Sequence, residues 1–312
     1  MRILVANSRS GTVRRLAGGL PGRAGRRAAE TALRGALAGT GVEDTEIRIV
    51  PPRRIEAMLR AAAHQADELW VGGGDGTLRT AARFLIHTGK PLGVVPLGTM
   101  NLLARDLGIP LDLGGALRAL AAAPVGRIDV GRMNQALFLN KSALGLYPEM
   151  IIDRERRQRL WGHGKWPAMI RAMWRALRRN RLMTLTLETA GEAPRRIVTP
   201  AIVVTTSAYE FRPGRLFRKP TLASGHLTAY ISHERRWMGS LGQFAKLFLG
   251  TLQRDPKLEI VQTDRLVLEF PRSRPVANDG EVEFIRGPVA YSVEPRALAV
   301  RWPGLAGDTE TA

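Results

Sequence analysis

The first 125 residues alternate regularly between short apolar runs and longer helix-forming runs, and this rhythm constrains the fold more than any other feature. The apolar runs occupy residues 2–7, 46–50, 67–73 and 91–98, and the helix-forming runs occupy residues 24–39, 53–65, 78–89, 100–108 and 114–123. Strands that alternate with helices in this way form βαβ units around a parallel sheet. Because the runs are short and apolar, both faces of that sheet should be covered. We therefore predict that residues 1–125 form an α/β domain with a parallel, Rossmann-like sheet.

The rhythm changes near residue 125, where strand-like segments follow one another with turn signals between them. These segments occupy residues 125–134, 135–145, 182–190, 195–207, 225–232, 265–270, 281–287 and 289–295. Successive short strands of this kind are typical of a β-sandwich. We expect residues 126–295 to form a second, β-sandwich domain, and residues 296–312 either to close that domain or to return to the first.

The amino-acid composition limits the kinds of molecule that the protein is expected to bind. The chain has 312 residues, of which 45% are hydrophobic, so a substantial core can form. Its formal net charge of +19 favours an anionic partner, such as nucleic acid, an acidic membrane surface or a phosphate-bearing substrate. The absence of cysteine excludes disulfides and thiolate metal sites. The N-terminal residues do not resemble a signal peptide, and no apolar run approaches the roughly 20 residues of a membrane span, so we expect a cytoplasmic protein.

Residues 71–80 (VGGGDGTLRT) place a glycine-rich loop directly after a predicted strand. Ligands of open α/β sheets bind at the carboxyl ends of the strands. Glycines permit positive φ angles and let backbone N–H groups approach an anion, and Thr77 is well placed to cap the following helix. The loop is therefore a candidate phosphate cradle; the alternative is a tight strand-to-helix turn with no ligand.

Asp75 is the informative residue of this loop. A carboxylate beside a phosphate is repulsive unless a cation or a hydroxyl group lies between them. The acid therefore suggests a magnesium nucleotide or a sugar hydroxyl group. The loop is neither a P-loop nor a G-x-G-x-x-G fingerprint, and the alternative role for Asp75 is that of a turn-forming residue.

Two further polar loops should lie on the same edge of the sheet. Residues 6–11 (ANSRSG) end the first predicted strand with Asn7, Ser10 and Gly11. Residues 95–110 (VPLGTMNLLARDLGIP) follow another strand, with Gly98 and Thr99 at its end and Asn101 at the start of a helix. Although each loop alone has an ordinary capping role as its alternative, the three together predict a shared nucleotide cleft.

These segments resemble the diacylglycerol kinase catalytic-domain family, the soluble bacterial lipid kinases related to sphingosine and ceramide kinases. ANSRSG resembles the family's first nucleotide loop, GGGDGTL its phosphate loop, and PLGTMNLLARDLGIP its Pro-Leu-Gly-Thr-x-Asn motif. The run IDVGRMNQALFLNKSALGL is similar to the entry into the second domain, and NDGE at residues 278–281 looks like the late Asp-Gly-Glu motif. The resemblance extends over nearly the whole chain, with the motifs in the same order.

The resemblance implies an ATP-binding first domain, a lipid-binding β-sandwich and an active site between them. The candidate nucleotide contacts are Asn7, Ser10, Gly11, Gly72, Gly73, Gly74, Asp75, Gly76, Thr77, Leu78, Gly98, Thr99 and Asn101. It also implies that Asp279 and Glu281 serve the acceptor hydroxyl group. We favour Glu281 as the base and Asp279 as a metal or substrate partner, with the reverse assignment open. Phosphoryl transfer with ATP and Mg²⁺ needs such a carboxylate; taken alone, NDGE is also strong hairpin-turn chemistry.

The chain departs from the family's pattern at two places. After the glycine loop the family often has Asn-Glu, where this chain has Arg79 and Thr80. The family often holds a structural Mg²⁺ with an Asp-Gly-x-Leu segment, where this chain has Ser224 in place of the aspartate. The second departure puts the structural metal site in doubt, whereas Mg²⁺ bound with ATP, for which Asp75 is a candidate ligand, is unaffected.

Residues 153–181 combine ten Lys/Arg with two acids, and apolar residues that include Trp166 and Trp174 recur there at helical spacing. A basic amphipathic helix of this kind can lie on an anionic membrane; the alternative is a helix packed on the sandwich with its arginines in water. Residues 212–219 (RPGRLFRK) read as an exposed basic loop. Residues 237–252 read as a second amphipathic stretch that could wall a lipid cleft.

These observations favour an ATP-dependent lipid kinase that acts at the inner face of the membrane as a peripheral protein. An NAD kinase is the main alternative, because it shares a Gly-Gly-Asp-Gly loop. A non-enzymatic nucleic-acid binder is suggested by charge alone, and no nucleic-acid recognition motif supports it. The sequence identifies neither the lipid nor the oligomeric state.

Overall fold

The computed structural model describes residues 1–161, 178, 181–212 and 215–306. The chain forms two compact units: Met1–Ile128 together with Arg296–Ala312, called unit 1, and Asp129–Pro295, called unit 2. Two strands pass from one unit into the other. They are β5 (Val125–Met133) and β18 (Val289–Arg301).

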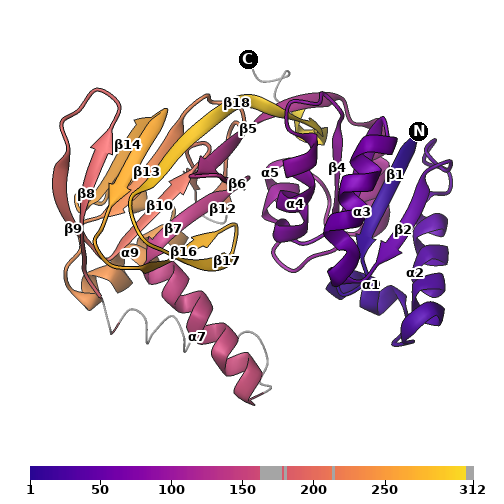
Figure 1. The fold of residues 1–312 in the computed structure, drawn as a ribbon, viewed down its shortest axis with the longest axis horizontal. Coiled ribbons are helices and arrows are strands. Elements are labelled where there is room, and N and C mark those ends of the chain that lie inside the picture. The colour runs from indigo at the N-terminus through magenta and orange to yellow at the C-terminus, as the bar shows by residue number, and fades with distance from the viewer. Residues whose placement is uncertain (162–177, 179–180, 213–214, 307–312) are drawn as a thin grey trace. The chain divides into compact units, whose positions relative to one another are not determined.

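Unit 1 begins as the predicted alternation of strands and helices (Figure 1). Its elements are β1 (Arg2–Asn7), α1 (Gly11–Leu16), α2 (Gly22–Leu37), β2 (Glu46–Val50), α3 (Pro52–Gln65), β3 (Glu68–Gly73), α4 (Asp75–Leu85), β4 (Leu92–Pro96), α5 (Leu102–Asp106), α6 (Leu113–Ala122) and the short 3-10 turn Pro303–Ala306. The strands β1, β3 and β4 are almost entirely buried, as expected of strands covered on both faces.

The sheet of unit 1 has the order β2-β1-β3-β4, and every neighbouring pair is parallel. The C-terminal part of β18 adds to β4 in the same direction, with Val300 opposite Leu92. Helix α3 contacts α4, and α2 contacts α6. The prediction of an α/β fold with a parallel sheet is confirmed. The order also places a topological switch point between β1 and β3, because the chain leaves β1 in one direction and returns on its other side.

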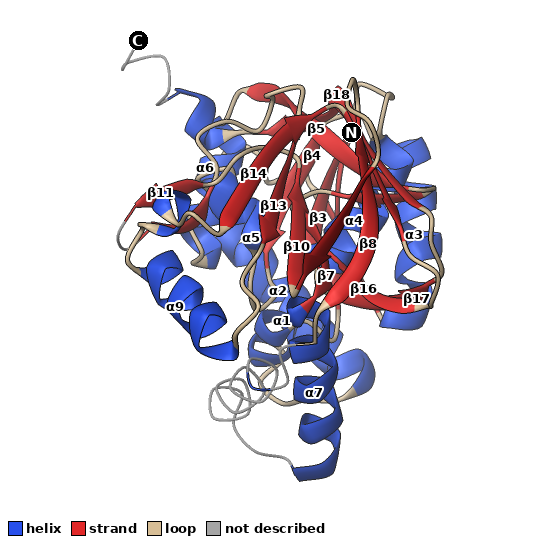
Figure 2. Cartoon of the chain, turned by 90° about the vertical axis from the view of Figure 1, so that its left-hand side faces the viewer, coloured by secondary structure: helices blue, strands red, loops and turns tan. Residues whose placement is uncertain are grey.

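Unit 2 is built from antiparallel strands (Figure 2). One sheet has the order β14-β13-β10-β7-β16-β17, and the other contains β18, β15, β8 and β9 with β5 and β6. The bounds are β6 (Ala136–Phe138), β7 (Lys141–Gly145), β8 (Met183–Thr189), β9 (Arg195–Thr199), β10 (Ala201–Thr205), β13 (Leu227–Ser232), β14 (Leu258–Thr263), β15 (Arg265–Glu269), β16 (Arg274–Asn278) and β17 (Glu281–Ile285). Buried residues of both sheets form one hydrophobic core, so the predicted β-sandwich is confirmed.

The helices of unit 2 are α7 (Leu146–Trp161) and α9 (Trp237–Phe248), with a 3-10 turn at Leu252–Arg254 and a hairpin of β11 (Glu210–Arg212) and β12 (Arg215–Arg218). Helix α7 contains the first residues of the predicted basic helix 153–181; most of that segment, including Trp166 and Trp174, lies outside the described residues. Among the helices that the structure describes, none is long and apolar enough to cross a membrane.

A buried ion cluster ties β18 to the sheet of unit 1. The carboxylate of Glu68 accepts hydrogen bonds from Arg301 at 2.7 and 2.9 Å and from Arg2 at 3.0 Å. The indole N–H of Trp70 donates to the same carboxylate at 2.6 Å. Burial raises the pKa of Glu68, but the hydrogen bonds from Arg301 and Trp70 and the charges of Arg2 and Arg301 outweigh it, so the pKa lies below its ordinary value.

Candidate active site

The three predicted nucleotide loops leave the same edge of the sheet in unit 1. Asn7 ends β1, Gly73 ends β3 and Pro96 ends β4. In the register of the strands, Ala6 lies opposite Gly72, and Gly73 lies opposite Pro96. The loops after β1 and β3 flank the switch point, which is where open α/β sheets bind their ligands.

The glycines of these loops serve close backbone packing. A Cβ atom on Gly98 would lie 2.5 Å from the Cα of Gly74 and 3.1 Å from the carbonyl oxygen of Gly73. A Cβ atom on Gly72 would lie 2.5 Å from a methyl group of Leu97. None of these glycines has a positive φ angle, so the expectation that the loop uses that conformational freedom is wrong. The loops after β3 and β4 instead touch backbone to backbone.

Helix α4 begins earlier than the sequence predicts. Gly74 is its N-cap residue, and Thr77 lies within the first turn with its N–H bonded to the carbonyl of Gly74 at 2.9 Å. The predicted capping role of Thr77 is therefore wrong. Because Gly74 has no side chain to cap the helix, the N–H groups of the first turn have no side-chain acceptor at the N-cap. Thr80, at one departure from the family pattern, bonds back to the carbonyl of Gly76 at 3.0 Å.

Asp75 joins two of the loops. One of its carboxylate oxygens accepts the backbone N–H of Leu103, in the first turn of α5, at 3.3 Å. The acid therefore does more than form a turn: it anchors the loop after β4 to the loop after β3, while remaining only partly buried.

Two buried oxygen atoms at this edge have no hydrogen-bond partner, namely Oγ of Ser10 and Oδ1 of Asn101. Asn101 has a φ angle of 50° and occupies the N-cap position of α5 without capping it. Its amide donates instead to the carbonyls of Gly98 at 3.2 Å and Pro96 at 3.4 Å. Buried polar atoms are nearly always paired in native proteins, so these two oxygens are consistent with a site that receives a polar ligand. Neighbouring Thr99 is exposed.

The NDGE segment forms a tight hairpin in unit 2. Asn278 ends β16 and Glu281 begins β17, and the two residues pair across the ladder. Between them, Asp279 has a φ angle of 48° and Gly280 of 89°. Positive φ at both central residues is the mark of a type I′ turn, so the alternative reading of this motif as a hairpin describes its backbone correctly.

The two acids of this hairpin have different surroundings. The carboxylate of Asp279 is 8% exposed and accepts three backbone N–H groups: those of Leu139 at 2.7 Å, Asn140 at 2.9 Å and Lys141 at 3.1 Å. Glu281 is exposed. Asp279 therefore fixes the hairpin to the segment that leads into β7, and Glu281 presents its carboxylate at the surface of unit 2.

The surroundings of Ser224 do not fit the structural Mg²⁺ that the family resemblance implies. The hydroxyl group of Ser224 is hydrogen-bonded to Ser207 Oγ at 3.1 Å, to the carbonyl of Thr206 at 3.2 Å and to the backbone of His226. Mg²⁺ in proteins is usually held through carboxylates. No group of three His, Cys, Asp or Glu side chains that could hold a metal occurs within the described residues.

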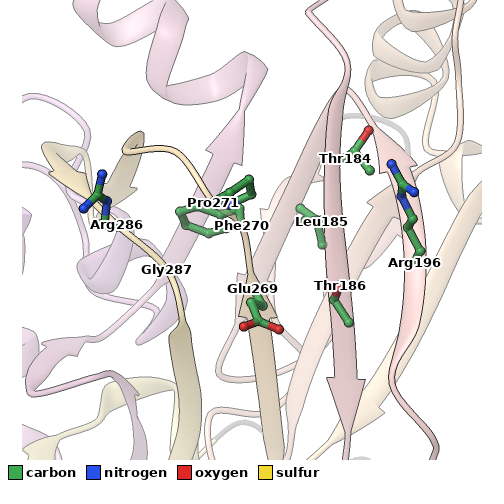
Figure 3. A pocket seen from close by; sticks show the side chains of 9 residues that line it. All are labelled: Thr184, Leu185, Thr186, Arg196, Glu269, Phe270, Pro271, Arg286 and Gly287. Atoms are coloured by element: carbon green, nitrogen blue, oxygen red, sulfur yellow. The ribbon is translucent and has the colours of Figure 1, made fainter.

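A cavity of about 700 Å³ opens on unit 2, away from the predicted motifs in sequence (Figure 3). Arg286 and Arg196 lie on opposite sides of it, with Glu269 between them (Figure 3). Its lining includes no residue of the predicted nucleotide loops or of the NDGE hairpin.

Sequence patterns missed the contacts that hold these groups in place. The three N–H donors to Asp279 come from residues about 140 positions earlier, and the partner of Asp75 is a backbone group. The polar pair Asn140 and Lys141 inside the apolar run ALFLNKSALG was the available signal.

Comparison with known proteins identifies the N-terminal region. Residues 3–133 match the family described as "Diacylglycerol kinase catalytic domain". The chain is 40% identical over 95 residues to a protein of Pseudomonas savastanoi named "Probable lipid kinase YegS-like", and the alignment covers 30% of each chain. It is 39% identical over 90 residues to a protein of Staphylococcus aureus named "Diacylglycerol kinase", and this alignment covers 28% of each chain.

Solved structures resemble the whole chain in fold. One protein of Bacillus anthracis superposes with a TM-score of 0.72 at 19% identity, and the match covers 96% of both chains. A second, described as a diacylglycerol kinase of the same organism, gives a TM-score of 0.66 at 15% identity over 96% of both chains. At these identities the likeness is one of fold, whereas the family match in sequence covers residues 3–133, which include the three loops. The likeness to the diacylglycerol kinase catalytic domain family is thus one of sequence over residues 3–133 and one of fold over 96% of the chain.

Proposed function

We propose that this protein is an ATP-dependent lipid kinase that transfers the γ-phosphoryl group of ATP to the hydroxyl group of diacylglycerol or a related lipid. The observation that carries the proposal is the edge of β1, β3 and β4, where the three loops of the matched region meet. The named relatives are lipid kinases, which favours a lipid acceptor over the NAD of the alternative function.

Unit 1 supplies the groups that would bind the nucleotide. Gly74 and Gly98 pack backbone to backbone beside the start of α4, and the first turn of that helix would offer N–H groups to phosphate oxygens. The unpaired oxygens of Ser10 and Asn101 can accept hydrogen bonds from the nucleotide. Bound ATP and Mg²⁺ would supply the phosphoryl group and the positive charge that offsets it, and Asp75 is the carboxylate among the candidate residues that could face the metal.

Unit 2 supplies the base. Three backbone N–H groups occupy the carboxylate of Asp279, which is buried, so this acid is poorly suited to take a proton from a substrate. Glu281 is exposed and follows the turn that Asp279 fixes. We therefore assign Glu281 as the group that orients the acceptor hydroxyl group and takes its proton, and Asp279 as the residue that positions the hairpin.

Labelled phosphate transfer tests the substrate class. Purified protein is incubated with ATP and Mg²⁺ and, in parallel reactions, with diacylglycerol in mixed micelles, other hydroxylated lipids, or NAD. We expect label in one or more lipids and none in NAD. Transfer to NAD alone would overturn the lipid kinase proposal, and transfer to a lipid other than diacylglycerol would identify the acceptor.

Paired substitutions test the roles of the two acids. Glu281→Gln should lower kcat by about 10²- to 10⁴-fold, the usual contribution of a general base, with an unchanged melting temperature because the side chain is exposed. Asp279→Asn should instead destabilise unit 2 by about 1–3 kcal/mol, because it sets an amide against backbone donors. The assignment is wrong if Glu281→Gln retains full turnover.

Action at a membrane surface is supported by helix α9, which has apolar residues on its exposed side. Ser240 and Gln243 are buried in α9 and both are polar; Ser232 Oγ donates to Gln243 at 2.7 Å. Its exposed side has Met238 and Leu241, followed by Leu249, while Arg235 and Arg236 are exposed just before the helix. Exposed apolar residues flanked by arginines suit the interface of an anionic bilayer. We propose that α9 contacts the inner membrane face.

A further inference from the structure

Lys219 is a buried cation in the loop that the sequence predicts to be exposed. Its side chain is 2% exposed, so the expectation of an exposed basic loop at residues 212–219 is wrong at this residue. The ammonium group donates to the carbonyl oxygen of Asn140 at 3.0 Å and to Oγ1 of Thr206 at 3.1 Å. It also lies 5.9 Å from the ring centroid of Tyr209. Lysine is almost never fully buried unless its charge is compensated, so this placement calls for an explanation.

The carbonyl groups near Lys219 belong to the peptides that hold Asp279. The peptide between Asn140 and Lys141 receives the ammonium group at its oxygen and donates its N–H to Asp279. The preceding peptide, between Leu139 and Asn140, accepts the hydroxyl group of Thr206 at 3.4 Å and likewise donates its N–H to Asp279. A cation at the oxygen end of a peptide polarises the group and strengthens its N–H as a donor. Lys219 and the carboxylate of Asp279 therefore act on opposite ends of the same peptide.

Ser224 lies next to this network. Its hydroxyl group contacts the carbonyl of Thr206, whose side chain contacts Lys219. The same loop is held by Asp129, which accepts the N–H of Gly225 at 2.6 Å. Main-chain carbonyl and hydroxyl oxygens of this kind are ligands that a hard cation takes. Ser224 lacks the carboxylate through which Mg²⁺ is usually held, whereas the ammonium group of Lys219 bonds to a carbonyl and a hydroxyl oxygen of the adjoining network, those of Asn140 and Thr206.

We propose that Lys219 is an internal cation that positions the Asp279–Glu281 hairpin, so that this chain needs no structural metal there. The ammonium group polarises the 140–141 peptide, that peptide and its neighbour hold Asp279, and Asp279 sets the turn from which Glu281 projects. The catalytic consequence rests on the proposed function; the structural consequence does not. Lys219 is thus a positioning residue, since its effect on the reaction passes through two other residues.

Amide hydrogen exchange of Lys219→Met tests the structural part. Removing the ammonium group should speed exchange at Leu139, Asn140 and Lys141 by about tenfold, as expected for the loss of a charge-assisted hydrogen bond. Lys90→Met is the matched control, because the Lys90 ammonium group also donates to main-chain carbonyls, those of Ala63 and His64, but in unit 1. The control should leave exchange at residues 139–141 unchanged. Unchanged exchange in Lys219→Met overturns the proposal.

If Lys219→Met does not fold, a variant that keeps Lys219 tests the same hydrogen-bond network. Thr206→Val removes the hydroxyl group that contacts both the ammonium group and the Leu139 carbonyl. Exchange at Asn140 should again be faster, while protection in β3 and β4 of unit 1 stays constant. Equal protection of Asn140 in Thr206→Val and the unsubstituted protein contradicts the network.

Metal removal and kinetics test the remaining parts. In the unsubstituted protein, EDTA should change neither the melting temperature nor exchange at residues 139–141, and elemental analysis should find no stoichiometric divalent metal. A metal whose removal speeds exchange of these amides would overturn the proposal.

In lipid phosphorylation with added Mg²⁺, Lys219→Met should lower kcat about tenfold with an unchanged KM for ATP, since unit 1 is intact. An inactive unsubstituted protein would refute the proposed function and leave the exchange result to decide the role of Lys219.

Discussion

At the scale of single residues, the candidate nucleotide loops depend on glycines at positions where a Cβ atom does not fit. Gly98 has an ordinary backbone conformation, so an alanine there would be unstrained in itself; the obstacle is the Cα of Gly74 at 2.5 Å from the new atom. Backbone cannot swing aside as a side chain does, so the two loops would have to separate. This requirement is visible only in three dimensions, because the sequence shows glycines without showing what each one touches.

Gly98→Ala should therefore weaken ATP binding by about tenfold or more, with about 1–3 kcal/mol of destabilisation from overpacking. Isothermal titration with ATP measures the affinity, and thermal unfolding measures the stability. Gly35→Ala in α2 is the matched control, because a Cβ atom there meets nothing within 4 Å. Equal ATP affinity in Gly98→Ala and the control would show that this edge is not the nucleotide site.

At the scale of elements, the ion cluster of Glu68 couples β3 to β18. Glu68 is 7% exposed, and its carboxylate is bonded to Arg2, Trp70 and Arg301. Its pKa is lowered, so its contribution to stability is fully present above the ordinary value of 4.5 and is lost as the pH falls through the lower, folded-state pKa. The loss of stability of unit 1 at acidic pH therefore reports on the ion cluster of Glu68 that couples β3 to β18.

Glu68→Gln should destabilise unit 1 by about 3 kcal/mol near neutral pH, the usual cost of removing one partner of a buried ion pair. The difference from the unsubstituted protein should stay constant down to about pH 4.5 and shrink at lower pH, where the unsubstituted carboxylate also becomes protonated. Amide exchange of β3 and β4 as a function of pH measures the effect. A difference that grows as the pH falls would contradict the assignment.

The elements themselves were largely predictable, and the contacts between them were not. Apolar runs such as RILVAN and ELWVGG become buried parallel strands because their composition leaves no polar face for solvent. The capping role predicted for Thr77 is wrong because the N-cap is Gly74, a residue with no capping side chain. The exposure predicted for Lys219 is wrong because charge alone suggests exposure, whereas its oxygen partners come from segments distant in sequence. Local patterns encode periodicity; they do not encode which distant backbone atoms will meet.

At the scale of the whole molecule, the net charge of +19 and the exposed apolar residues of α9 are the two features on which the proposed contact with an anionic bilayer rests. Long-range attraction to an anionic bilayer falls with ionic strength, whereas insertion of Met238 and Leu241 does not depend on it in the same way. Salt and apolar substitution should therefore separate the two contributions.

Vesicle sedimentation should show binding to phosphatidylcholine vesicles that contain phosphatidylserine, weaker binding without it, and weaker binding at high salt. The double variant Met238→Asp/Leu241→Asp should reduce binding to the anionic vesicles about tenfold or more, because two apolar side chains are lost from the interface. Leu111→Asp is the control, since Leu111 in unit 1 is 41% exposed, close to the 40% of Leu241. If the control and the double variant bind alike, α9 is not the contact.

The position of β18 in the sequence also determines when unit 1 can complete its fold during synthesis. Most of unit 1 precedes unit 2 in the sequence, yet the second strand partner of β4 and one of the two guanidinium groups that bond to Glu68 come from Val300 and Arg301, after all of unit 2. N-terminal domains generally fold first as they leave the ribosome. Here one edge of β4 lacks its partner until β18 has been synthesised, and an unpaired strand edge of this kind is open to pairing with another chain.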